Sequence, residues 1–206
     1  MTRYALLIIA RVTLLVGYFP IYCYLIVKFY GKYSVYTIKY WSRSSHFCYV
    51  IKSNDKYLFL KVRNSVSSLY NSCVGHPQPH FNDQMAMIMA LPKNAQTELF
   101  PAIYNIDGMV ALDFLLGYFA LDKIIVLEEN RTQLFAGILK KTENLHSLGY
   151  VHGDIKLKNI MYNPKNQDIK FVDLDYFDKI NAFSIENEER QIKNLASILL
   201  LSTDKK

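Results

Sequence analysis

The sequence predicts an α+β fold in which an antiparallel, β-rich first part precedes a helical second part. Three observations predict it: short β-rich runs between turn residues at 34–62, a hairpin signal at Asp107-Gly108, and two long amphipathic patterns beyond residue 130. Hydrophobic residues make up 51% of the 206 residues and charged residues 20%, so the chain can bury a sizeable core. Its length allows one compact domain or two small lobes.

The first part consists of strands with one helix among them. Residues 34–40, 47–52 and 56–62 are β-rich runs that predict an antiparallel meander. Residues 82–91 have helical apolar spacing, with Met85, Ile88 and Met89 on the apolar face, and end before Pro92, which predicts a short helix. Two more apolar runs, 99–106 and 109–116, flank Asp107-Gly108 and predict a hairpin, which gives five strands in all.

The second part is predominantly helical. Residues 130–148 form an amphipathic pattern that ends at Gly149, and residues 188–201 form a second one. Strand-like runs at 160–162 and 169–172 lie between them. The apolar positions expected to pack inward on the second helix are Ile192, Leu195, Ile198 and Leu199.

Residues 1–34 form a separate apolar segment. Residues 12–27 run for sixteen residues without a charge, which is short of the ~20 that a spanning helix needs. Three interpretations stay open: membrane association through residues 5–27, an apolar segment packed on the domain, and a cleaved signal.

Cysteine content and net charge give weaker indications. Cys23, Cys48 and Cys73 are an odd number without a C-x-x-C pair, which predicts free thiols in a reducing, cytosol-facing compartment. A net charge of +6 is compatible with a phosphate-bearing ligand or an anionic membrane face, but it is also common on ordinary domains. No nucleic-acid partner is expected.

The residues that carry chemistry begin at Tyr150. The segment 150–163 reads YVHGDIKLKNIMYN, and a strand-like run that ends in Asp173-Leu174-Asp175 follows it. Its His152, Asp154, Lys156 and Asn159 resemble the catalytic loop of protein kinases, and Asp173 resembles the aspartate of the D-F-G motif, with Asp175 in place of glycine. This resemblance to the protein-kinase superfamily implies a two-lobed fold: a five-stranded antiparallel amino-terminal lobe with one helix (35–117) and a truncated helical carboxyl-terminal lobe (118–206).

The resemblance also implies roles for these residues. Phosphoryl transfer needs a carboxylate that orients the acceptor hydroxyl and oxygen ligands that hold Mg²⁺ on the phosphates of ATP. Asp154 and Lys156 are therefore the expected catalytic residues, and Asn159 and Asp173 the expected Mg²⁺ ligands. His152 is expected to pack and hydrogen-bond within the loop.

The expected nucleotide contacts lie in the first part of the chain. Lys61, on the third strand, corresponds to the lysine that contacts the α- and β-phosphates. The helix at 82–91 offers Gln84 where a glutamate partner for that lysine is usual. The loop between the first strands lacks glycine, so Ser44 and Ser45 are the candidates for phosphate contact, and the backbone at Asp113, Phe114 and Leu115 is the candidate for adenine.

The expected function is ATP- and Mg²⁺-dependent phosphorylation of a protein serine or threonine. Gly153 replaces the arginine that meets a phosphorylated activation loop in regulated kinases, so such regulation is not expected. The chain resembles minimal, divergent kinases of bacterial effectors and large DNA viruses. Two alternatives stay open: a small-molecule kinase of the aminoglycoside or lipopolysaccharide type, and a nucleotide-binding pseudokinase.

Overall fold

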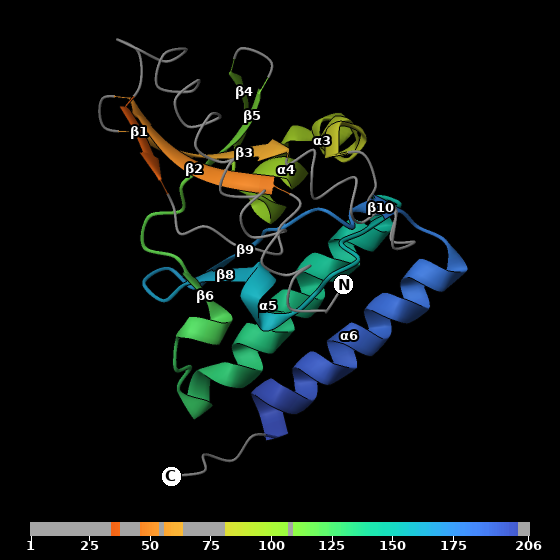
Figure 1. Ribbon diagram of the computed structural model, residues 1–206. Helices are drawn as coiled ribbons and strands as arrows, with labels where there is room; N and C mark the ends of the chain where they lie inside the picture. The colour runs from red at the N-terminus through yellow and green to blue at the C-terminus, as the bar shows by residue number, and fades with distance from the viewer. Residues whose placement is uncertain (1–33, 38–45, 54–55, 64–80, 107–108, 202–206) are drawn as a thin grey trace, which may run out of the picture. The chain divides into compact units, whose positions relative to one another are not determined.

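The computed structural model describes residues 34–37, 46–53, 56–63, 81–106 and 109–201 (Figure 1). These residues form an α+β structure with four helices and three small antiparallel sheets, as the sequence predicts. They fall into two compact units. The first unit contains the described residues up to 63 and Ile103–Phe114, and the second contains 81–102 and 115–201.

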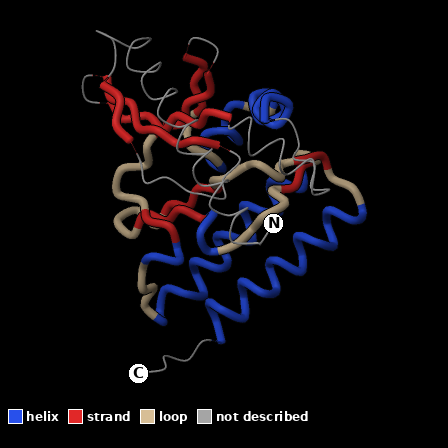
Figure 2. Tube along the Cα trace, viewed as in Figure 1, coloured by secondary structure: helices blue, strands red, loops and turns tan. Residues whose placement is uncertain are grey.

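The first unit is a five-stranded antiparallel sheet with the order β1-β2-β3-β5-β4 (Figure 2). Its strands are β1 (Ser34–Thr37), β2 (His46–Ser53), β3 (Lys56–Arg63), β4 (Ile103–Ile106) and β5 (Met109–Asp113). Tyr49 on β2 lies opposite Leu60 on β3, which in turn lies opposite Ala111 on β5, and all three side chains are buried. Residues directly opposite one another on paired strands point to the same face of the sheet, so these three side chains identify its buried face. The predicted hairpin residues 107–108 lie outside the described residues, but β4 and β5 pair on either side of them.

The described part of the second unit contains two long helices together with two short ones and two small sheets. Its helices are α3 (Phe81–Ala90), α4 (Lys93–Leu99), α5 (Glu128–Ser147) and α6 (Ala182–Leu201), with short 3-10 turns at Leu121–Lys123 and Leu157–Asn159. Its strands form a three-stranded sheet, β6 (Phe119–Ala120), β8 (Ile160–Asn163) and β9 (Asp168–Phe171), and a two-stranded one, β7 (Tyr150–Val151) and β10 (Asp178–Lys179). Helices α5 and α6 lie side by side in Figure 1.

The buried stripes of these helices follow the expected spacing, with two exceptions. Leu134, Ile138 and Leu145 of α5 are buried at helical intervals, as are Leu195 and Leu199 of α6. Ile198 was expected to pack inward but is 49% exposed, because it lies about 100° around the helix from Leu199. Met89 of α3, also assigned to the apolar face, is 56% exposed.

Helix α4 was not predicted from the sequence, which instead predicted a strand from residue 99. Pro92, whose φ of −52° suits a helix start, precedes the first turn, and the amide of Gln96 donates to the Pro92 carbonyl at 3.0 Å. Leu99 is therefore the last residue of a helix and is fully buried. The strand begins only at Ile103, after Pro101.

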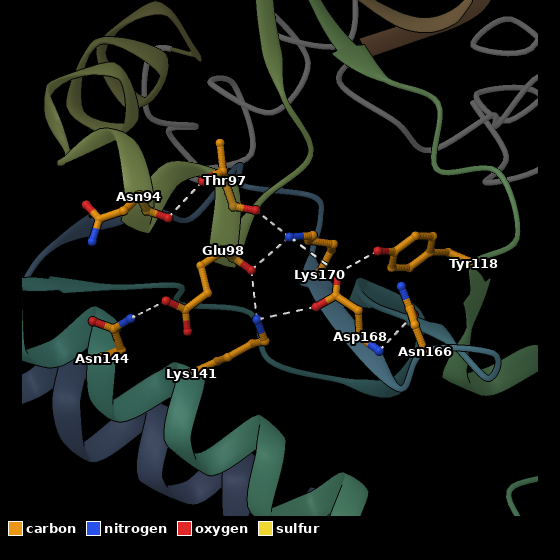
Figure 3. A network of polar contacts seen from close by, with 9 residues as sticks. All are labelled: Asn94, Thr97, Glu98, Tyr118, Lys141, Asn144, Asn166, Asp168 and Lys170. Carbon is orange, nitrogen blue, oxygen red and sulfur yellow. Dashed lines mark hydrogen bonds and ion pairs between the residues drawn. The ribbon is translucent and has the colours of Figure 1, made fainter.

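A polar network joins α4 to α5 and β9 (Figure 3). Lys141 of α5 donates to the Glu98 carbonyl at 2.7 Å, and Lys170 of β9 donates to the carbonyls of Thr97 and Glu98. These carbonyls belong to the last turn of α4 and have no partner within the helix, so the lysines cap it. Asp168 lies 3.7 Å from Lys141 Nζ and 3.4 Å from Lys170 Nζ, which balances their charge.

Tyr118 completes this network by donating its hydroxyl to Asp168 Oδ2 at 2.5 Å. Burial, and then this bond, raise the pKa of Tyr118 to about 12 from its ordinary 10.0. Burial alone would raise the pKa of Asp168, but the bond from Tyr118 and the two lysines hold it below its ordinary value. Burial lowers the pKa of Lys141. The folded state therefore favours the neutral phenol beside an ionised carboxylate.

We expect the contribution of Tyr118 to stability to be lost at alkaline pH. Because its folded pKa is raised, this contribution is full below about pH 10 and declines as the pH approaches 12. Tyr118→Phe should lower the free energy of unfolding by about 1 kcal/mol at pH 8, and the difference from wild type should shrink toward pH 12. Denaturant unfolding of both proteins across this range measures it. A difference that stays constant with pH would contradict the role of Tyr118.

The apolar segment at 1–34, including 5–27, lies outside the described residues except for Ser34, so its three interpretations stay predictions. Among the residues that the structure does describe, none of the helices has the length and apolar character needed to span a membrane.

Candidate functional site

Residues 152–159 lie between β7 and β8, and hydrogen bonds of the buried His152 hold them in place. His152 is fully buried, and its ring packs edge-on against Phe171 of β9. Its Nδ1 accepts the Asp154 amide at 3.2 Å, so its Nε2 carries the proton and donates to the Val172 carbonyl at 3.1 Å. Burial lowers the pKa of His152, which keeps the ring neutral. His152 therefore has the structural role expected for it.

Asp154, Lys156 and Asn159 form one contact cluster. Lys156 Nζ lies 2.5 Å from both carboxylate oxygens of Asp154. Asn159 Nδ2 donates to Asp154 Oδ2 at 2.8 Å and to the Asp154 carbonyl at 2.9 Å. The Lys156 and Asp154 side chains are 42% and 21% exposed, and ion pairs this exposed contribute at most about 1 kcal/mol to stability. The cluster fixes the direction of the Asp154 carboxylate.

Asp173 lies at the end of the β8–β9 pair at which Asn159 also lies. The amide of Val172 donates to the Asn159 carbonyl at 3.0 Å, which extends the β8–β9 ladder by one pair. Because Asn159 directly precedes β8 and Asp173 follows Val172, the two predicted metal ligands lie at one edge. Asp173 has a φ of +62°, a conformation that non-glycine residues seldom adopt and that aspartate tolerates better than most. Such strain is concentrated at functional sites.

The amide side chain of Asn159 has one orientation that satisfies its surroundings. Its nitrogen faces two oxygens of Asp154, so Oδ1 points away from them. Asn159 Oδ1 and the Asp173 carboxylate are oxygen donors, which Mg²⁺ prefers, and one or two protein oxygens suffice where phosphates and water complete the shell. Within the described ranges no group of three or more His, Cys, Asp or Glu side chains could hold a metal alone. The donor set fits Mg²⁺ bound together with phosphate.

Helix α6 holds the backbone on both sides of Asp154. Glu188 is fully buried, and its Oε1 accepts the Gly153 amide at 2.8 Å while its Oε2 lies 2.5 Å from His146 Nε2 of α5. Gln191 accepts the Ile155 amide at 2.6 Å and donates to the Gly153 carbonyl at 2.8 Å. The sequence did not predict that Glu188 and Gln191 contact this loop. The available signal was a pair of polar residues three positions apart on the inward face of an amphipathic helix.

Gly153 is required by the geometry of the loop. Its φ is +79°, and a Cβ at this position would lie 2.4 Å from the Tyr176 carbonyl oxygen. The arginine that kinases carry here would therefore not fit this backbone. The departure from the family pattern has a local structural cause.

Gly153→Ala should destabilise the protein more than Gly149→Ala, its matched control. Gly149 also has a positive φ, +85°, but a Cβ there would meet nothing within 4 Å. Both changes incur about 1–2 kcal/mol of backbone strain, and Gly153→Ala adds a clash with backbone. We expect its free energy of unfolding to fall by at least about 1 kcal/mol more than that of the control. Equal losses in denaturant unfolding would contradict the close packing against Tyr176.

Gln84 has a partner that the resemblance does not suggest. It is buried on α3, and its Nε2 donates to the carbonyl of Asp175, two residues after Asp173. The glutamine thus holds the segment that follows the predicted metal ligand. A glutamate in its place would lose this donor, so Gln84→Glu should weaken the hold on this segment.

The candidate nucleotide contacts at Lys61, Ser44, Ser45 and residues 113–115 are only partly described. Lys61 lies on β3 opposite Cys48 of β2, and its phosphate contact stays a prediction, while Ser44 and Ser45 lie outside the described residues. The Phe114 amide donates to the Tyr57 carbonyl at 3.1 Å, and the Leu115 carbonyl accepts the Tyr118 amide at 3.2 Å. These two backbone groups are already paired. The Asp113 carboxylate lies 3.6 Å from Lys56 Nζ.

Comparison with known proteins adds no relative: no protein-family model matches the chain, and no curated protein matches it.

Proposed function

We propose that this chain transfers the γ-phosphoryl group of ATP to the hydroxyl of a serine or threonine in a protein. One observation carries this proposal: a carboxylate, Asp154, is held by a lysine and an asparagine within hydrogen-bond distance, and a second aspartate, Asp173, lies at the same sheet edge. Phosphoryl transfer requires this combination of an orienting carboxylate, a cation and oxygen ligands.

Each residue has a defined role in the proposed reaction. Asp154 orients the acceptor hydroxyl and accepts its proton as the hydroxyl oxygen bonds to the γ-phosphorus and the bond to the β-phosphate oxygen breaks, which releases ADP. Lys156, paired with Asp154 in the absence of substrate, supplies positive charge for the transferring group. Asn159 and Asp173 would hold Mg²⁺, which when bound neutralises charge on the phosphates.

The contacts around the cluster favour preorganisation. His152 bonds both Asp154 and Val172, so one neutral ring fixes the loop and the strand end that carries Asp173. Positioning and electrostatic stabilisation supply most of the catalysis in phosphoryl transfer. The roles of Lys61 in phosphate contact and of residues 113–115 in adenine contact are part of this proposal and depend on the resemblance alone.

The test is incubation of the full chain with γ-labelled ATP, Mg²⁺ and separate acceptors: serine- and threonine-containing peptides, a host-cell protein extract, and aminoglycosides. Label on serine or threonine that depends on Mg²⁺ supports the proposal. Label on the aminoglycoside alone would favour the small-molecule kinase. Saturable ATP binding without label on any acceptor would favour the pseudokinase and overturn the proposal.

A further inference from the structure

Gln191 of α6 spans Asp154 from one side of the loop to the other. Its Oε1 accepts the amide of the residue after Asp154, Ile155, at 2.6 Å, and its Nε2 donates to the carbonyl of the residue before it, Gly153, at 2.8 Å. We propose that Gln191 is a positioning residue that fixes the backbone of Asp154 and so the point and direction from which its side chain projects. This inference depends on the proposed function for its catalytic consequence, but its structural part can be tested separately.

The two bonds act on the two peptide planes that flank Asp154. A side-chain amide that accepts from one residue and donates to another, two positions earlier, imitates the pairing of a neighbouring strand. Because peptide groups are planar, fixing the planes before and after Asp154 leaves its φ and ψ little freedom. The direction of its Cα–Cβ bond follows from those two angles, and the contacts with Lys156 and Asn159 then set the carboxylate.

The helix that carries Gln191 is itself anchored. Glu188, three residues earlier and on the same face, is fully buried and accepts the Gly153 amide at 2.8 Å. The second oxygen of Glu188 contacts His146 in the last turn of α5. Gln191 is thus supported by two long helices, and rigid support of this kind is what places a catalytic group within a fraction of an ångström.

The predicted metal ligands have backbone contacts in which Gln191 takes no part, although the Asn159 side chain also donates to Asp154. Asn159 and Val172 pair through the backbone, and His152 bonds the Val172 carbonyl. Loss of the Gln191 contacts should therefore displace Asp154 more than the paired backbone of Asn159 and Val172, which precedes Asp173. We expect a change in turnover with little change in nucleotide affinity.

The experiment compares Gln191→Met with wild type. Methionine has the length of glutamine but makes neither hydrogen bond. We expect kcat to fall at least about tenfold, the Kd for ATP with Mg²⁺ to stay within about twofold, and hydrogen exchange of the Ile155 amide to become faster while the amides of α6 keep their protection. Lys193→Ala, an exposed residue on the same helix, is the matched control and should match wild type in all three measurements.

The outcomes test the two backbone contacts of Gln191, here called the clamp, separately from the proposed function. Wild-type kcat in Gln191→Met, or unchanged exchange at Ile155, would overturn the inference, as would a joint loss of kcat, ATP affinity and α6 protection, which indicates a merely structural role. If Gln191→Met does not fold, Gln191→Glu, which keeps the acceptor for Ile155 and loses the donor to Gly153, takes its place. For this variant the criteria are a lower kcat with a nearly unchanged Kd for ATP, and a wild-type kcat would overturn the inference. If wild type transfers no phosphate, the proposed function fails, and faster exchange at Ile155 in the variant still supports the clamp.

Discussion

Asp154→Asn is expected to reduce phosphoryl transfer at least about a hundredfold, which corresponds to about 2.7 kcal/mol of transition-state stabilisation. An asparagine keeps an oxygen that can accept from Asn159 Nδ2 but cannot take the proton of the acceptor hydroxyl at neutral pH. It also removes the negative charge that holds Lys156 at 2.5 Å. ATP affinity should change little, because the proposal places neither nucleotide nor metal on Asp154. Initial rates with labelled ATP and a separate nucleotide titration measure the two effects.

Asparagine is preferable to alanine at this position because of the contacts that Asp154 makes. Alanine would leave the amide of Asn159, which is 2% exposed, without its side-chain acceptor, and an unsatisfied buried donor costs about 1–3 kcal/mol. A loss of activity in Asp154→Ala would then combine chemistry with loop distortion. Asp178→Asn, an exposed carboxylate in β10, is the control and should keep wild-type rates. If Asp154→Asn keeps more than about a tenth of wild-type activity, Asp154 does not have the proposed role.

Periodicity predicted the elements that bury a regular stripe or face. The pattern Leu134, Ile138, Leu145 identified α5 because burial on one side of a helix needs this spacing. It did not identify α4, a short helix whose buried residues are only Ala95 and Leu99, too few to form a recognisable pattern. Leu99 and Phe100 are consecutive apolar residues, so the run from residue 99 looked like a buried strand. In the structure Leu99 is buried at the end of a helix and Phe100 is buried after it.

The candidate site was predicted from the spacing of its side chains, but its supports were not. Asp154, Lys156 and Asn159 lie within six residues, so their mutual contact follows from a local turn. Glu188 and Gln191 contact the same loop from more than thirty residues away, and although helical spacing places them on the inward face of α6, it does not indicate which groups they contact. Gln84 illustrates the converse: the resemblance suggested Lys61 as its partner, and the structure shows an acceptor that no sequence motif records, the Asp175 carbonyl.

The structure also changes how the departures from the kinase pattern are interpreted. Gly153 and Gln84 each depart from it, and each makes a specific contact: Gly153 packs against the Tyr176 backbone, and Gln84 bonds the Asp175 carbonyl. Both contacts lie on the segment that follows Asp173. These departures are therefore consistent with a different way of fixing that segment, and they are not by themselves an argument for a pseudokinase.

Asp173→Asn is expected to abolish the dependence of ATP binding on Mg²⁺. Asn tolerates a φ of +62° about as well as Asp, so the backbone should be preserved while the charge is removed. The Kd for ATP with Mg²⁺ should rise at least about tenfold, or 1.4 kcal/mol. Without Mg²⁺ the affinity should stay equal or improve, because a carboxylate beside the phosphates repels them. Nucleotide titrations of both proteins, with Mg²⁺ and with a chelator, measure these changes.

The direction in which ATP affinity changes without Mg²⁺ distinguishes a metal ligand from a structural residue. If Asp173 only stabilised its loop, Asp173→Asn would weaken ATP binding equally with and without Mg²⁺, and the free energy of unfolding would fall as well. Asp173→Ala is the comparison for strain, since alanine at this φ should lose about 1–2 kcal/mol of stability that asparagine keeps. If wild type binds ATP equally with and without Mg²⁺, the metal role of Asp173 is wrong and the pseudokinase interpretation is favoured.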